Sequence, residues 1–182
     1  MNAPLLASIL TAATLSLGFS LESRGADDAR NAGAVSGRLG VPEETFVLKA
    51  AQDELMQIQL GELAQQKGRR AGVTKFADSM VTDHTRLNDA LKALASQKGI
   101  TLPDRLDAIH AGVVDRLSKL EGEQFDKAYI DEMIRTHRTS ISGFEEAAKI
   151  SRDTDLRTFL SRGLPALKTH LKQIQNIQFG AG

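Results

Sequence analysis

The chain of 182 residues contains no cysteine, no tryptophan and only one tyrosine. Without cysteine, thiol catalysis, disulfides, iron–sulfur clusters and thiolate metal sites are all excluded. Aromatic residues make up 4% of the chain, a scarcity that favours helices over a β-sandwich or barrel. The length suits about one domain with a full hydrophobic core.

The chain also lacks an excess of charge of either sign, because 23 lysines and arginines balance 23 aspartates and glutamates. Residues 1–20 carry none of these, so the remainder of the chain is equally neutral. Nucleic-acid binding needs a basic surface that attracts phosphates. We therefore expect no nucleic-acid partner.

The first part of the chain has the pattern of an export signal. Residues 3–21 are uncharged and mostly apolar, with small residues at Gly18 and Ser20. This pattern predicts a signal peptide over residues 1–20 that is cleaved after Ser20. The alternative is an uncleaved anchor, because the run is just long enough to span a membrane. Membrane contact would then occur only through this segment.

The rest of the chain divides into a linker and a helical domain. Residues 21–41 are rich in Gly, Ala, Asp and Arg without an apolar period, which predicts a flexible linker. Residues 42–180 carry apolar side chains at helical spacing between start and stop signals. We expect four long helices, at about 42–67, 71–98, 123–150 and 154–177, and an extra short helix at about 101–120 between the second and third.

Prolines mark two of the expected helix boundaries. Thr101 and Asp104 flank Pro103 in a sequence like a capping box, so the short helix should start there. Pro165 lacks an amide hydrogen and disfavours helical geometry at Leu164, so the last helix should bend or restart. No segment has strand periodicity, and the short connections favour an all-α, antiparallel four-helix bundle.

A nine-residue pattern occurs twice in the predicted helices. FADSMVTDH ends at His84 and YIDEMIRTH ends at His137; both contain an aromatic residue, an Asp, a Met followed by a β-branched residue, and a final His. Met80 precedes His84 by four residues, and Met133 precedes His137 by four. Each pair therefore lies one turn apart on one face of a helix.

His84, His137 and His170 all fall on the apolar seams of their helices, near the middle of the bundle. Helix midpoints lie at one height in an up-and-down bundle, so these side chains should meet in one layer. The first helix would add Glu54 or Gln57. Imidazoles beside thioethers suit copper, and imidazoles alone suit zinc. The predicted metal ligands are His84, His137, His170, Met80, Met133 and Glu54.

Two other interpretations of these residues stay open. Buried histidines often bond to neighbouring side chains or carbonyls and can fix the register of a bundle. They can also be partly exposed and unconnected. The two methionines, taken alone, are typical core filling.

The sequence lacks the motifs of bundle enzymes. A di-iron bundle uses Glu-x-x-His on two helices, but Val81, Ile134 and Leu167 stand three residues before the seam histidines. His110 does follow Asp107 by three residues, which alone is a weak signal. Phosphate-binding glycine loops and nucleophile elbows are also missing. We expect no enzymatic activity and assign no catalytic or organic-cofactor residue.

From Phe46 to about Ile177 the chain resembles a bacterial family of exported ferritin-like bundles, domain of unknown function 4142. The matching stretches are FVLKAAQDELMQIQLGELAQQKG, FADSMVTDHTRLNDALKALASQKGITLP, FDKAYIDEMIRTH and LPALKTHL. The resemblance implies a ferritin-like bundle, a periplasmic or periplasm-facing location and no established activity. Family members often have Glu where this chain has Gln57 and Gln59, so a hard-metal site is disfavoured and Glu54 is the remaining carboxylate.

Two functions from different classes follow. The first is a non-catalytic structural or interaction module of the cell envelope, which binds an unknown envelope partner or itself. The second is a transition-metal protein that holds copper or zinc in the histidine layer. Replacement of His84 by an apolar residue separates them, because only the second function makes stabilisation by added metal depend on that ring.

Overall fold

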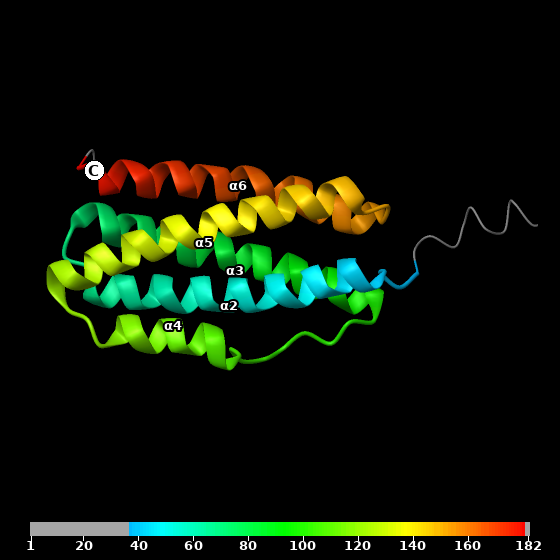
Figure 1. The fold of residues 1–182 in the computed structure, drawn as a ribbon, viewed down its shortest axis with the longest axis horizontal. Coiled ribbons are helices and arrows are strands. Elements are labelled where there is room, and N and C mark those ends of the chain that lie inside the picture. The colour runs from blue at the N-terminus through cyan, green and yellow to red at the C-terminus, as the bar shows by residue number, and fades with distance from the viewer. Residues whose placement is uncertain (1–36, 181–182) are drawn as a thin grey trace, which may run out of the picture. The chain divides into compact units, whose positions relative to one another are not determined.

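The computed structural model describes residues 37–180, which form five α-helices and, within that range, no strand (Figure 1). The four long helices are α2 (Val41–Lys67), α3 (Ala71–Lys98), α5 (Gly122–Ile150) and α6 (Thr154–Gln178), and α4 (Ala108–Ser118) is short. The all-α class predicted from the sequence is confirmed. The predicted signal peptide, and the predicted linker up to residue 36, lie outside the described residues.

The long helices pack side by side, α2 against α3 and α5 against α6 (Figure 1). α3 also packs on α6, and α2 on α5, so the four helices share one interior. α4 lies on the outside of this group, against α2 and α5. Within residues 37–180, no helix has both the length and the apolar character needed to cross a bilayer.

The helix ends follow local sequence signals. Gly99 ends α3 in the left-handed conformation, with φ of 69°, which a glycine adopts without a steric penalty. Asp107 caps α4 by accepting hydrogen bonds from the amides of Ile109 and His110, both at 2.9 Å. Each cap satisfies backbone groups that the helix itself leaves without partners.

Two predictions of helix boundaries are wrong: the start of the short helix and a restart of the last helix at Pro165. The short helix begins at Ala108 rather than Thr101, because Asp107 provides a cap that the Thr101 sequence does not. α6 runs without interruption through Pro165. Pro165 is exposed, as is Ser161 one turn earlier, whose carbonyl the proline has no amide hydrogen to bond.

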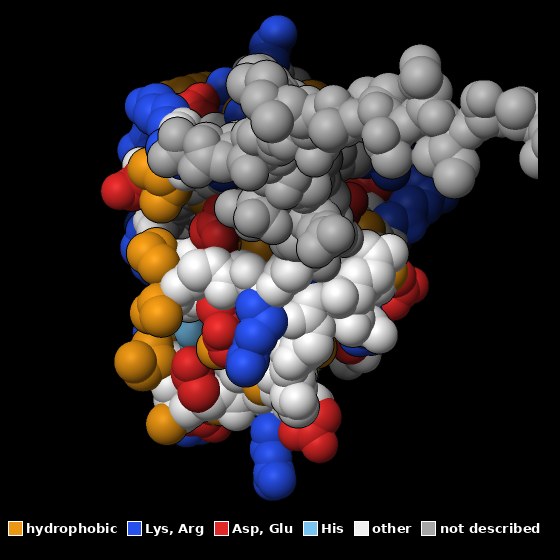
Figure 2. Space-filling model, turned by 90° about the vertical axis from the view of Figure 1, so that its right-hand side faces the viewer, with side chains coloured by type: hydrophobic (Ala, Val, Ile, Leu, Met, Phe, Trp, Pro, Cys, Tyr) orange, Lys and Arg blue, Asp and Glu red, His pale blue; other side chains and the backbone are white. Residues whose placement is uncertain are grey.

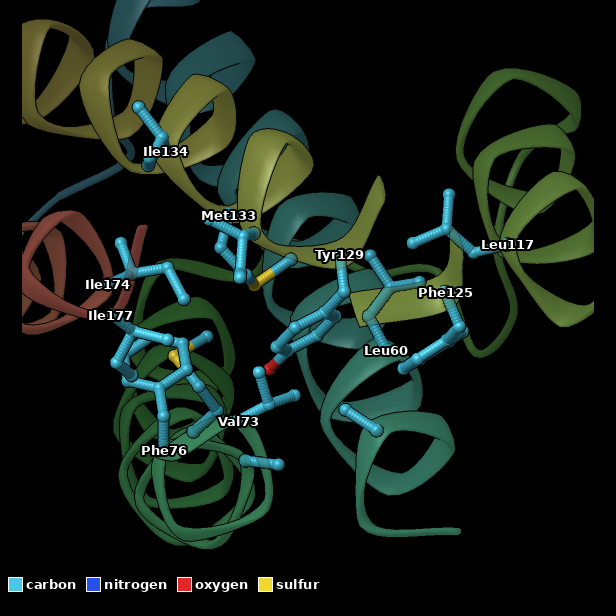
Figure 3. Close-up of a cluster of buried hydrophobic side chains, with 14 of the residues drawn as sticks. Leu60, Val73, Phe76, Leu117, Phe125, Tyr129, Met133, Ile134, Ile174 and Ile177 are labelled. Carbon is cyan, nitrogen blue, oxygen red and sulfur yellow. The ribbon is translucent and has the colours of Figure 1, made fainter. Parts of the chain in front are cut away.

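The buried core is divided into two apolar clusters. One cluster includes Phe76, Tyr129, Met133 and Ile174, which pack against one another in Figure 3. The other includes Phe144 and apolar residues from the opposite ends of the same four long helices. Between them lies a layer of buried polar side chains: Glu54, Gln57, His84, Asn88, Thr136, His137 and His170. A polar layer inside a core is costly unless its groups are paired.

Candidate metal centre

Three helices place one histidine each at the centre of this layer. His84 comes from α3, His137 from α5 and His170 from α6, and none is more than 3% exposed. Their ring centroids are 5.4, 5.5 and 5.6 Å apart, which makes a nearly equilateral triangle. One nitrogen of each ring lies within 4.8 Å of the corresponding nitrogens of the other two.

Each ring is held from outside the triangle by its second nitrogen. His84 Nδ1 lies 2.7 Å from Glu54 Oε2, and His137 Nδ1 lies 2.8 Å from the carbonyl oxygen of Met133. His170 Nε2 lies 3.0 Å from Asp83 Oδ2. A carbonyl or carboxylate oxygen accepts the proton of the ring nitrogen, which leaves the lone pair on the inner nitrogen.

The inner nitrogens, His84 Nε2, His137 Nε2 and His170 Nδ1, have no hydrogen-bond partner among residues 37–180. Buried polar atoms nearly always have a partner, so three such atoms in one place call for an explanation. The arrangement of a ring held outside by an oxygen, with its free nitrogen directed inward, is the one found around protein-bound metals.

The surroundings of His137 and His170 disfavour a positive charge on these two rings. Burial lowers the pKa of His137 from 6.5 to about 3, and the nearby His84 ring acts in the same direction, against the hydrogen bond to Met133. Burial and His84 also lower the pKa of His170, although Asp83 opposes them. A neutral imidazole is the form that binds a metal ion, so these two rings need not lose a proton first at neutral pH.

An aromatic side chain covers one side of the triangle. The Phe76 ring centroid lies 6.0 Å from that of His170 and 6.5 Å from that of His137. Phe76 is itself 4% exposed and belongs to the cluster in Figure 3. The apolar cover lowers the local dielectric and limits access of water from this direction.

The sequence-predicted ligands differ in what they contact in the structure. The three histidines converge, and Glu54 reaches the outer nitrogen of His84 rather than the inner set. Met80 and Met133 are fully buried in the apolar cluster, and Met133 contributes its backbone carbonyl to His137. The interpretation of the histidines as partly exposed and unconnected is wrong, because all three are buried and bonded.

Gln57 and Gln59 differ in their surroundings. Gln57 is buried, and its Nε2 donates a hydrogen bond to Thr136 Oγ1 at 2.8 Å. Thr136 directly precedes His137 in the chain. Its Oε1 is buried without a partner among the described residues. Gln59 is exposed and takes no part in the layer.

Asp83 is the residue that the sequence-based prediction missed. It directly precedes His84 on α3, yet its carboxylate holds His170 on α6. The only signal in the sequence is an acidic residue beside a seam histidine. The fourth histidine, His110, lies on α4, outside the triangle. Its Nδ1 lies 2.8 Å from Asp107 Oδ1 at the start of the same helix, and its Nε2 lies 3.2 Å from Asp53 Oδ1 on α2.

The fold is similar to solved structures of distant sequence. A DUF305 fragment from Deinococcus radiodurans aligns with a TM-score of 0.68 at 14% identity, over 77% of this chain and 97% of that one. CopM in its Cu(I)-bound form aligns with a TM-score of 0.64 at 17% identity, over 77% and 98%. CopM in a co-crystallised Ag-bound form gives 0.63 at 16%, over 76% and 96%. At these identities the similarity concerns the fold alone.

Family membership comes from the sequence match. A search of curated proteins finds no significant match. The model of the family described as "Domain of unknown function (DUF4142)" matches residues 28–177, which is most of the chain. The chain therefore belongs to the DUF4142 family.

Proposed function

We propose that the protein binds one transition-metal ion, copper(I) in the first place, between His84, His137 and His170. The observation that carries the proposal is the convergence of three buried ring nitrogens without partners. A buried polar atom left without a hydrogen bond costs about 1–3 kcal/mol. A bound ion would satisfy all three atoms at once.

A purely structural role accounts for only half of the arrangement. The outer bonds to Glu54, Met133 and Asp83 tie neighbouring helices or turns together, as register-fixing polar groups do. The outer bonds would fix the helix register equally well if the inner edges of the three rings packed against apolar side chains. A purely structural role therefore does not explain why three inner nitrogens without partners converge, or why His137 is buried deeply enough to lower its pKa.

The size of the triangle suits a small metal ion after a modest contraction. A triangle with sides of at most 4.8 Å has its centre at most about 2.8 Å from each corner, whereas zinc–nitrogen bonds are about 2.0–2.1 Å long. Each ring would therefore move inward by at most about 0.8 Å, within the range of side-chain torsions.

The local charge favours a monovalent ion. Two carboxylates lie behind the rings. That of Asp83, behind His170, is 39% exposed and lies 3.6 Å from Arg86, so water and the guanidinium offset its charge. Metal-bound imidazoles are neutral and add no charge. The buried charge is therefore that of Glu54, which is 3% exposed and lies directly behind His84. One positive charge balances this carboxylate, whereas a divalent ion would leave an excess in a medium that solvates charge poorly. The copper(I)- and silver-bound forms of CopM, which share the fold, support the same choice.

Zinc is the second candidate, because three imidazoles with an open fourth position form an established zinc ligand set. A copper(I) site and a zinc site should behave differently when the two ions compete for the protein. A copper(I) site should retain its ion in the presence of equimolar zinc, and a zinc site should exchange copper(I) for zinc under reducing conditions.

We place this site in a non-catalytic, periplasmic protein with a ferritin-like antiparallel four-helix bundle. The paired packing of the four long helices supports the bundle, and the apolar run before Glu22 supports export. All three ligands come from one chain, so neither an envelope partner nor self-association is needed to complete the site. On the face shown in Figure 2, acidic and basic side chains intermingle, which supports our proposal that nucleic acid is not a partner.

The experiment that tests the function is metal stoichiometry. The purified protein is incubated with copper(I) under anaerobic reducing conditions, or with zinc, then desalted and analysed for bound metal. We expect one ion per wild-type chain and none in His137→Leu. His110→Leu is the matched control, because His110 lies outside the triangle, and it should retain one ion. A wild-type chain without metal, or equal metal in His137→Leu, would contradict the proposal.

A further inference from the structure

A crevice between α3 and α6 leads from the surface to two of the three histidines. Its volume is about 280 Å³, and its lining includes His84 and His170. A larger cavity between α2 and α5, of about 570 Å³, is lined by Glu54 but by none of the three histidines. The α3–α6 crevice is therefore the better candidate for access to the rings.

Small residues line this crevice on both helices. Gly163 lies on its α6 wall, and Ala90 and Ala166 line its α3 and α6 sides. A Cβ atom at Gly163 would stand 2.8 Å from Phe144 Cε1 and 3.1 Å from a Leu87 methyl group. The glycine thus lets α6 approach its neighbours closely, while the alanines leave space in the crevice between α3 and α6.

Asp83 stands where the crevice meets solvent. Its side chain is 39% exposed, whereas that of His170, which it holds at 3.0 Å, is 4% exposed. Arg86 and Arg162 line the same crevice, and Arg86 lies 3.6 Å from Asp83. With Arg86 beside it and Arg162 on the same crevice, the single carboxylate cannot act by attracting cations from a distance. Its contribution must come through His170.

The three histidines are not held equally firmly. Glu54, which holds His84, is almost fully buried, and the carbonyl that holds His137 belongs to the backbone of its own helix. Water competes for the hydrogen bond of an exposed carboxylate but not for these buried ones. His170 is therefore the ring whose outer bond opens most readily, and it is one of the two rings that line the crevice.

We propose that the metal ion enters and leaves through the α3–α6 crevice, with His170 as the movable ligand and Asp83 as the positioning residue that holds it in place. This inference rests on the metal-binding function proposed above. When the Asp83–His170 bond opens, His170 Nδ1 turns away from the triangle and the ion keeps two ligands. An incoming nitrogen or sulfur ligand can then reach it through the crevice.

The test measures the rate of copper transfer. Protein loaded with one copper(I) ion is mixed with an excess of a coloured bidentate copper(I) chelator, and transfer is followed by stopped-flow absorbance. Ala166→Leu narrows the crevice and should slow transfer about tenfold without changing the equilibrium affinity beyond about threefold, as expected when only access is obstructed. Ala90→Leu, on the opposite wall, provides the same obstruction in a second variant.

Ser142→Leu is the matched control, because Ser142 lines the α2–α5 cavity, and it should transfer copper at the wild-type rate. Asp83→Asn should speed transfer and weaken affinity by about 10- to 100-fold, the usual effect of loosening a ligand's outer partner. Slow transfer in Ser142→Leu, or wild-type rates in both alanine variants, would overturn the route. A wild-type chain that takes up no copper would overturn the metal-binding function itself, so the two failures are distinguishable.

Discussion

At the scale of single residues, His137 has the most unusual environment, since its side chain is fully buried and its pKa is lowered to about 3. The unfolded chain takes up a proton at this ring below its ordinary pKa of about 6.5. The folded chain does so only near the lowered value. The stabilising contribution of neutral His137 is therefore complete above pH 6.5 and is lost as the pH falls toward 3.

This shift predicts a difference in pH dependence between variants. Between pH 7 and pH 5, the free energy of unfolding of the metal-free wild type should fall by about 2 kcal/mol through His137 alone. His137→Leu and His137→Gln should lack this part of the slope. Urea unfolding at both pH values measures the difference. The pKa of His170 is lowered too, but that ring is present in all three chains and cancels. Equal slopes in the three proteins would rule out a buried, neutral His137.

Sequence spacing was sufficient to find the three rings but not their outer partners. His84, His137 and His170 lie on the apolar seams, and a seam in a bundle has only one interior to face. Asp83 holds a ring on another helix, so its contact depends on the axial positions of α3 and α6. Spacing along one helix carries no information about such an offset.

At the scale of elements, a buried ion pair joins the end of α3 to the start of α6. Lys98 Nζ lies 2.6 Å from Asp153 Oδ2 and 2.7 Å from Asp155 Oδ2, and Lys98 is 3% exposed. Burial opposes the charge, but these hydrogen bonds outweigh it and raise the pKa of Lys98. Asp153 also caps α6, so the loss of Lys98 would disturb both helices.

We expect Lys98→Met to lower the free energy of unfolding by about 2–4 kcal/mol, because it leaves a buried carboxylate without its partner. Lys92→Met is the control: Lys92 is exposed and its Nζ lies 3.5 Å from Asp89. That change should cost less than about 0.5 kcal/mol. Chemical denaturation of both variants gives the comparison, and similar losses would show that the ion pair has no special role.

The uninterrupted course of α6 gives a second prediction for an element. Pro165 lies inside the helix, exposed, with no amide to bond the carbonyl of Ser161. Pro165→Ala should restore that bond and raise the free energy of unfolding by about 1–3 kcal/mol. Thermal and urea unfolding would measure the gain. A loss instead would mean that the proline shapes α6 beside Gly163.

Helix ends were predictable where a local signal acts alone. Gly99 ends α3 because the left-handed conformation suits glycine. The start of α4 was misplaced because Asp107 caps it in competition with the Thr101 sequence. The continuity of α6 depends on packing of Leu160, Gly163 and Leu167 on one face, and tertiary packing of this kind overrides a local breaker.

At the scale of the whole described domain, the histidine layer separates two apolar cores that are built from opposite ends of the same helices. The layer is therefore the place where the two halves of the bundle are joined through polar groups. An ion bound there would link α3, α5 and α6 directly. α4 would not be linked, since it packs on the outside and buries only Val113 and Leu117.

This arrangement predicts a pattern of hydrogen exchange. At a free copper(I) concentration about 100 times the dissociation constant, binding should stabilise the fold by about 2.7 kcal/mol. Backbone amides around His84, His137 and His170, which we expect to exchange through the largest openings, should then slow by about a hundredfold. Amides of α4, which can open locally, should change little.

Hydrogen exchange followed by mass spectrometry, without copper(I) and with copper(I) buffered at this free concentration, would map this pattern onto the chain. α4 serves as the control within the same molecule, and His137→Leu as the control without a complete site. Slowing in α3, α5 and α6 that is lost in His137→Leu fits an ion held by three helices, because only binding at the triangle connects those segments. Slowing of α4 to the same extent, or slowing that persists in His137→Leu, would place the ion elsewhere on the protein.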